Sequence, residues 1–172
     1  MAHPLLPFWA PSMYWAISIT DAAVTLNKRS QAPLSATFLT GTAILLIGTS
    51  LRILCFRVLG RHFTLAMSLQ DDHSLVTSGP YAVVRHPSYT GGLLQALGAC
   101  LVGAGAGSWL ADGGYATPWG AFLGLNLAIL TVMWGYACTR GAKEDEFLAE
   151  KFGEKWKVYA QAVPYRYVPG VC

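Results

Sequence analysis

The sequence predicts an all-α integral membrane protein: a bundle of about four transmembrane helices plus a C-terminal amphipathic interfacial helix. The first observation is composition, because hydrophobic residues make up 53% of the 172 residues and charged residues only 12%, about half the charged fraction of a soluble domain. The second is that Asp112 is the only Asp, Glu, Lys or Arg between Arg85 and Arg140. The third is that four stretches approach the roughly 20 apolar residues that cross a bilayer core.

The four spans are expected at about residues 5–26, 33–54, 89–111 and 118–139 of one membrane domain covering residues 1–172. The first is the least regular, because prolines and one acid interrupt it. Small residues in the later spans would let helix backbones approach closely. These are the run Gly103-Ala-Gly-Ala-Gly107 and the pair Gly120 and Gly124.

Two polar segments, residues 57–88 and 140–172, fall on one side of the membrane if the chain crosses it four times. The opposite side holds only Lys28 and Arg29 as basic residues. The positive-inside rule therefore places both polar segments and both termini in the cytosol, so that residues able to do chemistry share one face. The basic residues of the two segments are Arg57, Arg61, Arg85, Arg140, Lys143, Lys151, Lys155, Lys157 and Arg166.

The last segment has the pattern of an amphipathic helix. Large apolar side chains recur at helical spacing, with lysines and glutamates between them. This pattern predicts a helix lying in the headgroup layer, although a helix packed on another protein surface would have the same pattern. The apolar residues are Phe147, Leu148, Phe152, Trp156 and Tyr159.

The sequence argues against several other classes. A net charge of +3 without a dense basic block gives no reason to expect nucleic acid as a partner. Asp71, Asp72 and His73 lack a second ligand set, so no metal site is expected. No Gly-rich phosphate-binding loop occurs. The cysteines form no C-x-x-C pair and are interpreted as small membrane hydrophobes; they are Cys55, Cys100, Cys138 and Cys172.

A first group of chemically capable residues leads into the third span. Gly79-Pro80 indicates a turn, and Arg85-His86-Pro87 follows it directly before the apolar stretch. A helix N-terminus carries unpaired N–H groups and a partial positive charge. Together with a guanidinium and an imidazole, it would form a pocket for a carboxylate. The alternative is that these residues only anchor the helix at the interface.

A second group follows the fourth span. Arg140 and Glu144 are four residues apart, so they share a helix face if the helix continues beyond the membrane. Glu144 and Asp145 could accept hydrogen bonds from an amino group or from ribose hydroxyls. A solvated, salt-bridged helix end is the alternative.

With these motifs the chain resembles the isoprenylcysteine carboxyl methyltransferase family and, more distantly, phospholipid N-methyltransferases. The resemblance covers about two thirds of the chain, from Leu51-Arg52 onward. Two departures are Asp145, where the family more often has a second Glu, and Trp156, where it often has Tyr. The matching motifs are Leu59-Gly-Arg-His-Phe-Thr64, His73-Ser-Leu-Val-Thr-Ser-Gly-Pro-Tyr81, Arg85-His-Pro-Ser-Tyr89, Arg140-x-x-x-Glu144-Asp145-x-x-Leu148, Phe152-Gly153 and Trp156-x-x-Tyr159.

The resemblance implies methyl transfer from S-adenosyl-L-methionine to the carboxylate of a prenylated cysteine. It also implies a membrane enzyme of the endoplasmic reticulum with its active site facing the cytosol and with membrane lipid around it. The implied catalytic residues are Arg85, Arg140 and Glu144. The implied cofactor-binding residues are Leu75, Val76, Gly79, Tyr81, His86, Pro87, Tyr89, Glu144 and Asp145.

Three other functions stay open. A phospholipid amine methyltransferase would need a base, such as His86, to deprotonate its acceptor. Residues 151–159 and the tail Val163-Pro-Tyr-Arg166 resemble sterol reductases, which use NADPH. A membrane scaffold without activity is the third, but it leaves the two polar groups on one face without an explanation.

Overall fold

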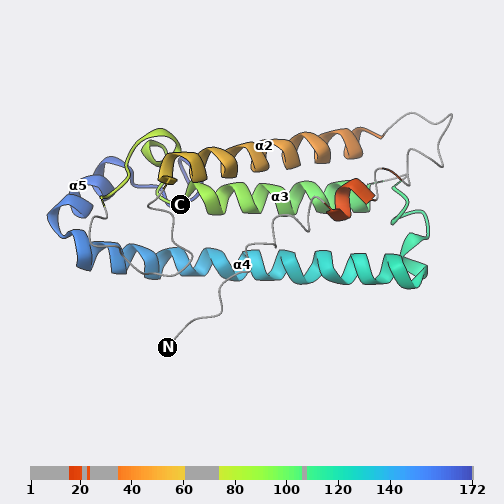
Figure 1. Cartoon of the computed structure of the whole chain (residues 1–172). Coiled ribbons are helices and arrows are strands. Elements are labelled where there is room, and N and C mark those ends of the chain that lie inside the picture. Colours follow the sequence, from red (N-terminus) through yellow and green to blue (C-terminus); the bar gives the residue numbers. More distant parts are fainter. Residues whose placement is uncertain (1–15, 21–22, 24–34, 61–73, 106–107, 172) are drawn as a thin grey trace.

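The described part of this computed structural model, residues 16–20, 23, 35–60, 74–105 and 108–171, contains helices and no β-strand. Three long helices lie side by side in an elongated bundle (Figure 1). The all-α class predicted from the sequence is therefore confirmed for these residues. In chain order the elements are α2 (Ala36–Leu59), η2 (Gly79–Ala82), α3 (Pro87–Ala104), η3 (Gly114–Ala116), α4 (Pro118–Phe152) and α5 (Glu154–Ala162).

Helices α2 and α4 each begin at a hydroxyl N-cap. Ser35 Oγ accepts a hydrogen bond from Phe38 N at 3.2 Å, and Thr117 Oγ1 accepts one from Gly120 N at 3.0 Å. Both helices end at a glycine with positive φ, Gly60 at 51° and Gly153 at 53°. These ends lie beyond residues 54 and 139, where the spans were expected to stop, because the caps and not the loss of hydrophobicity end the helices.

The 35 residues of α4 make it about 52 Å long at 1.5 Å per residue, whereas a bilayer core is about 30 Å thick. Its first part, residues 118–139, is apolar, and residues 140–152 carry the charged side chains. The charged turns therefore extend past any membrane that the apolar part crosses.

Helix α3 ends at Ala104, so the expectation that this span continues to residue 111 is wrong. Gly105 is extended, and the chain turns back through residues 108–117. The buried Ser108 hydroxyl donates to Gly103 O at 2.9 Å and accepts from Leu110 N at 3.1 Å. A side chain that bonds the backbone of the turn in this way competes with continuation of the helix.

Helices α2 and α3 approach each other closely at glycines other than those expected. A Cβ atom at Gly48 would lie 2.6 Å from Gly91 O, and one at Gly98 would lie 2.6 Å from Leu45 N. The two helices can pack this closely only because these positions lack side chains. Of the expected glycines, Gly120 and Gly124 instead make room for the loop around η3, at Gly114 and Tyr115.

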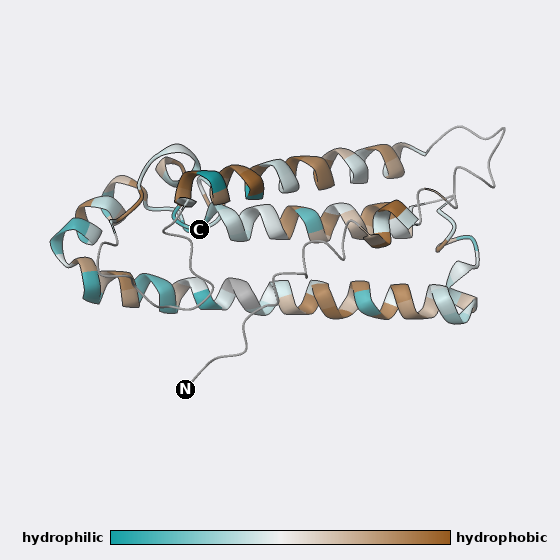
Figure 2. Cartoon of the chain, viewed as in Figure 1, coloured by the Kyte–Doolittle hydropathy of each residue, from teal (hydrophilic) through white to brown (hydrophobic). Residues whose placement is uncertain are grey.

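Two helices, α2 and α4, are long and apolar enough to cross a membrane. Figure 2 shows stretches of apolar residues, in brown, along both helices. Leu46 and Ile47 on α2 are 50% and 58% exposed, and Val132 on α4 is 72% exposed. An apolar surface of this extent indicates contact with lipid or protein. Of the span expected at residues 5–26, only residues 16–20 and 23 are among those described.

The C-terminal amphipathic segment is divided into two helices. Gly153 ends α4, and α5 packs its aromatic face onto the protein itself. Trp156, Tyr159 and Val163 are buried against a set of neighbours from α4, α5 and the loop before η2. The apolar face therefore contacts this chain, as in the alternative interpretation of the pattern. These neighbours are Leu75, Leu148, Ala149, Phe152 and Ala160.

Candidate functional site

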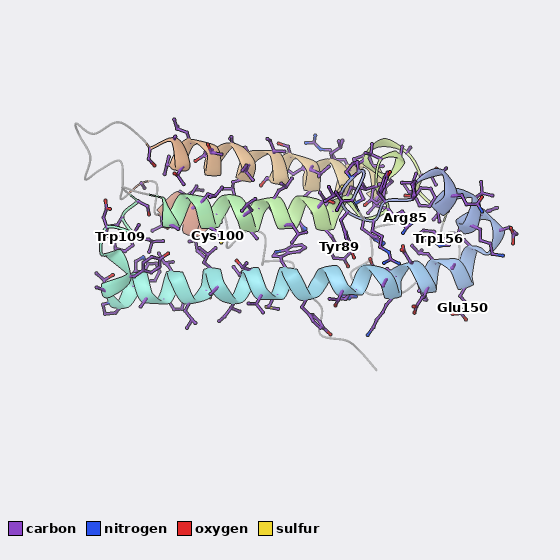
Figure 3. The ribbon with its side chains drawn as sticks, turned by 180° about the vertical axis from the view of Figure 1, so that it is seen from behind. Arg85, Tyr89, Cys100, Trp109, Glu150 and Trp156 are labelled. Atoms are coloured by element: carbon purple, nitrogen blue, oxygen red, sulfur yellow. The ribbon has the colours of Figure 1, made fainter. Side chains whose placement is uncertain are left out.

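A cluster of charged side chains occupies one end of the bundle. It forms where the N-terminus of α3, the charged turns of α4 and the C-terminal segment (residues 163–167) meet. Figure 3 shows Arg85 and Tyr89 at this end, with Trp156 of α5 beside them.

The turn before α3 places Arg85 and His86. Gly79 has a φ of 62°, which starts the 3-10 turn η2 and favours glycine. Tyr81 in this turn is buried, and its carbonyl oxygen accepts a hydrogen bond from Tyr159 Oη at 2.7 Å. This bond joins η2 to α5 and fixes the backbone that leads to Arg85 and His86.

Asp145 lies at the centre of the cluster, with its side chain 11% exposed. His86 Nε2 donates to Asp145 Oδ1 at 2.8 Å. Arg166 Nε donates to Oδ2 at 2.8 Å, and Arg85 Nη2 lies 3.2 Å from the same oxygen. One carboxylate therefore joins α3, α4 and the C-terminal segment through charge-assisted contacts.

Glu144 contacts the other side of the same imidazole. His86 Nδ1 lies 3.4 Å from Glu144 Oε2, and Tyr89 Oη donates to Oε1 at 3.1 Å. Both ring nitrogens of His86 thus face carboxylates. Only the protonated ring can donate a hydrogen bond from both nitrogens.

The ionisation of the cluster follows from these contacts. Burial alone would lower the pKa of His86, but its hydrogen bonds to Asp145 and Glu144 outweigh burial and raise the pKa above its ordinary value. Burial alone would raise the pKa of Asp145, but His86 and Arg166 outweigh it and lower the pKa. The contacts with Asp145 and Glu144 therefore favour the imidazolium form of His86.

The guanidinium of Arg140 is not paired with another described residue and could therefore bind a ligand. It shares the polar part of α4 with Glu144, as the spacing predicts, but makes no hydrogen bond or ion pair to another described residue. Arg85, in contrast, is occupied by Asp145 and by Val163 O at 3.3 Å. The buried Nε of Arg85 has no hydrogen-bond partner among the described residues.

The other expected cofactor-binding residues lie in the segment that leads to the ion cluster. Pro87 is buried in the first turn of α3, next to His86. Leu75 packs against α5, while the position of Gly79 faces Val58 of α2. Val76 is half-buried. Among the described residues, none of these four makes a hydrogen bond or ion pair within the ion cluster.

The sequence did not indicate the part that the C-terminal segment takes in the site. Arg85 N donates to Tyr165 O at 2.9 Å, and His86 N donates to Arg166 O at 2.8 Å. Thr90 Oγ1 donates to Tyr167 O at 2.7 Å. These bonds join residues almost 80 positions apart, which helical periodicity does not reveal. The only earlier signal was the resemblance of residues 163–166 to the tail of sterol reductases.

The first motif, residues 73–89, lies within the part of the chain that a family model matches. Residues 41–109 match the model of the isoprenylcysteine carboxyl methyltransferase (ICMT) family. Protein-S-isoprenylcysteine O-methyltransferase B of Arabidopsis thaliana is 29% identical over 126 residues, which are 72% of this chain and 55% of that protein. Protein-S-isoprenylcysteine O-methyltransferase of Schizosaccharomyces pombe (strain 972 / ATCC 24843) is 32% identical over 122 residues, 70% of this chain and 44% of that protein.

A second group of relatives has a different named activity. The 7-dehydrocholesterol reductase of Xenopus laevis is 31% identical over 97 residues, 56% of this chain but only 17% of that protein. The chain thus spans about half the length of the methyltransferases it matches and a much smaller part of the reductase. The resemblance inferred from the motifs is confirmed, and the chain is a relative of the isoprenylcysteine carboxyl methyltransferase family, matched through residues 41–109.

Proposed function

We propose that this protein transfers a methyl group from S-adenosyl-L-methionine to the C-terminal carboxylate of a prenylated cysteine. The observation that carries the proposal is that the two motifs meet in one cluster: His86 of the first contacts Glu144 and Asp145 of the second. The named activities of the methyltransferase relatives support the same reaction.

The residues present fit the cofactor. Its amino group and ribose hydroxyls need acceptors, and the Glu144 carboxylate is 28% exposed and fixed by His86 and Tyr89. Its carboxylate needs donors, and the buried Arg85 Nε lacks a partner among the described residues. When bound, S-adenosyl-L-methionine supplies an electrophilic methyl group on a sulfonium.

Arg140 is proposed to bind the carboxylate of the substrate. A guanidinium can pair with a carboxylate through two parallel hydrogen bonds, and that of Arg140 is not used within the described structure. A cysteine carboxylate is already ionised at neutral pH, so the chain does not have to remove a proton. Its task is to hold the two reactants in line, which can supply a large part of the reduction in barrier.

The geometry argues against an amine acceptor with His86 as the base. A base must accept a proton at neutral pH, but both nitrogens of His86 face carboxylates and its pKa is raised. Both ring nitrogens of His86 are thus engaged by carboxylates, and neither is left to accept a proton from an amine. An ionised carboxylate acceptor does not require such a base.

The membrane arrangement that we propose has four spans and a site that faces the cytosol in the endoplasmic reticulum. Three spans lie near residues 5–26, 33–54 and 118–139 in the sequence, and the fourth is α3, which ends at Ala104. The unequal distribution of Lys and Arg supports this orientation. The prenyl chain would lie against the exposed apolar faces of α2 and α4, at about 0.8 kcal/mol for each buried CH₂ group. Labelling that placed the two termini on opposite faces would contradict it.

The test is methylation of a farnesylcysteine analogue by the purified protein in lipid vesicles, at saturating S-adenosyl-L-methionine. Arg140→Ala is expected to raise the KM for the analogue by about a hundredfold, as loss of a charge-assisted pair would. Lys143→Ala is the matched control, because Lys143 is exposed on the same helix. Equal KM values for the two variants would remove Arg140 from the substrate site.

A reductase activity that uses NADPH is the second candidate. The similarity to 7-dehydrocholesterol reductases favours it. Calorimetry with each cofactor separates the two. Binding of NADPH without binding of S-adenosyl-L-methionine would overturn the methyltransferase proposal.

A further inference from the structure

We propose that Tyr167, in the C-terminal segment, is a positioning residue of this site, holding His86 and Tyr89 in the orientations in which they contact Glu144. Its side chain occupies the space that Gly141 leaves open on α4. The inference rests on the proposed function and adds to it a residue that lies outside both sequence motifs.

Tyr167 contacts both residues that contact Glu144. Its ring centroid lies 5.8 Å from that of His86 and 6.3 Å from that of Tyr89, in an edge-on arrangement with the latter. The rings of His86 and Tyr89 are themselves 5.8 Å apart. Such arrangements are favourable for aromatic pairs. The three rings therefore form one packed group, and movement of Tyr167 would release the other two.

The backbone around Tyr167 is held on one side by α3. Its carbonyl oxygen accepts from Thr90 Oγ1 at 2.7 Å, and the preceding carbonyl, that of Arg166, accepts from His86 N at 2.8 Å. The Arg166 side chain adds a contact with Asp145 on α4. Tyr167 thus has a defined position between α3 and α4.

Helix α4 bounds the ring on the other side. A Cβ atom at Gly141 would collide with Tyr167 Oη. It would also lie 3.0 Å from Tyr167 Cζ and 3.3 Å from His86 Cδ2. Gly141 is therefore needed as glycine because of the Tyr167 hydroxyl. Its φ is not positive, so backbone strain gives no other reason. Gly135, two turns earlier on the same helix, has no atom within 4 Å of its Cβ position and provides a matched control.

This arrangement predicts rescue between two substitutions. Gly141→Ala is expected to displace the ring and raise the KM for S-adenosyl-L-methionine about tenfold or more, since small misplacements at a site are costly. Tyr167→Phe alone keeps the ring and provides the reference KM. Tyr167→Phe added to Gly141→Ala removes the colliding oxygen and should return the KM to this reference value. Gly135→Ala should leave the KM unchanged.

The titration of His86, followed by NMR, is a readout that does not need methyl transfer. Tyr167→Ala is expected to loosen the contact with Glu144 and move the titration toward that of an ordinary imidazole, whereas Tyr167→Phe should not. Tyr167→Leu serves in the same way if the alanine variant does not fold. An unchanged titration in a folded Ala or Leu variant would overturn the inference. Absence of rescue in the Gly141→Ala, Tyr167→Phe double variant would do so as well.

The outcomes separate this inference from the proposed function. If the native protein transfers no methyl group to the farnesylcysteine analogue, the proposed function fails, but the titration still tests Tyr167. If methyl transfer occurs and Gly141→Ala behaves like Gly135→Ala, only the inference about Tyr167 fails.

Discussion

Replacing Asp145 with asparagine tests whether the ion cluster holds this end of the bundle together. The substitution keeps the shape of the side chain and removes its charge. His86, Arg85 and Arg166, which now contact two carboxylate oxygens, would share one acceptor oxygen and face an amide NH₂ group. The three elements that the carboxylate joins would lose their common partner.

The size of the expected loss in unfolding free energy follows from how deeply the three side chains are buried. The side chains of Asp145 and Arg85 are each 11% exposed and that of His86 is 7% exposed. Removing one partner of a buried pair costs about 3–5 kcal/mol, because an uncompensated charge remains. Arg166 is 44% exposed, so solvent screens its contribution to about 0–1 kcal/mol. The expected loss in the free energy of unfolding is therefore about 3–5 kcal/mol, mostly from Arg85 and His86.

The assay is denaturant unfolding in detergent at pH 7, with Glu150→Gln as the matched control. Glu150 lies on the same helix, is exposed and points away from the cluster (Figure 3), so its substitution should change the unfolding free energy by less than about 0.5 kcal/mol. The pKa of Asp145 is lowered in the folded state, so its contribution is present at neutral pH and lost as the pH falls through that value. A loss no larger than that of Glu150→Gln would refute the reasoning.

Three further predictions concern stability in detergent. Gly92→Ala would bring a Cβ atom 2.5 Å from the Trp134 ring and should cost about 1–3 kcal/mol by overpacking, whereas Gly135→Ala, which meets no atom within 4 Å, should raise the thermal unfolding temperature because alanine favours the helix by about 1 kcal/mol. The pKa of His86 is raised on folding, so its stabilisation is complete below its unfolded pKa and is lost as the pH rises through the folded value; His86→Asn should abolish this loss in unfolding measured from pH 6 to 9. Tyr159→Phe removes a buried bond to a carbonyl of η2 and should lower the unfolding free energy by about 0.5–1.5 kcal/mol in denaturant titration.

The helices were predictable because hydrophobicity is summed over many residues. A run of apolar side chains the length of α2 or α4 gives a strong signal whatever the tertiary contacts. Helix ends depend on single residues, so their positions were predicted less accurately. Ser108 bonds the turn after α3, and Gly153 ends α4. The pattern of residues 147–159 predicted the apolar face correctly but not its partner, because Trp156 would be equally suited to lipid or to protein.

The site was predictable in part for a similar reason. Spacing places Arg140 and Glu144 on one face of a helix, and α4 continues far enough to do so. The ion pair between them, which was the alternative interpretation of this spacing, does not form, and Tyr89 and His86 contact Glu144 instead. Contacts of this kind depend on how α3 and α4 are aligned, which no local pattern encodes. The same holds for Arg166, whose position relies on backbone hydrogen bonds to residues 85 and 86.

The alignment of α3 with α4 is set at two levels along the bundle. In the apolar part, the Trp134 ring fits against α3 only where Gly92 leaves space, and it stacks on the Arg52 guanidinium at 4.5 Å. At the polar end, Glu144 and Asp145 point in directions about 100° apart on their helix, so a single imidazole can contact both in only one position. An apolar contact fixes the helices roughly but tolerates small shifts, whereas charge-assisted bonds of 2.8 Å do not. The apolar contact therefore brings the helices into register, and the His86 cluster, with the C-terminal segment across it, sets the final geometry of the residues that would bind cofactor and substrate.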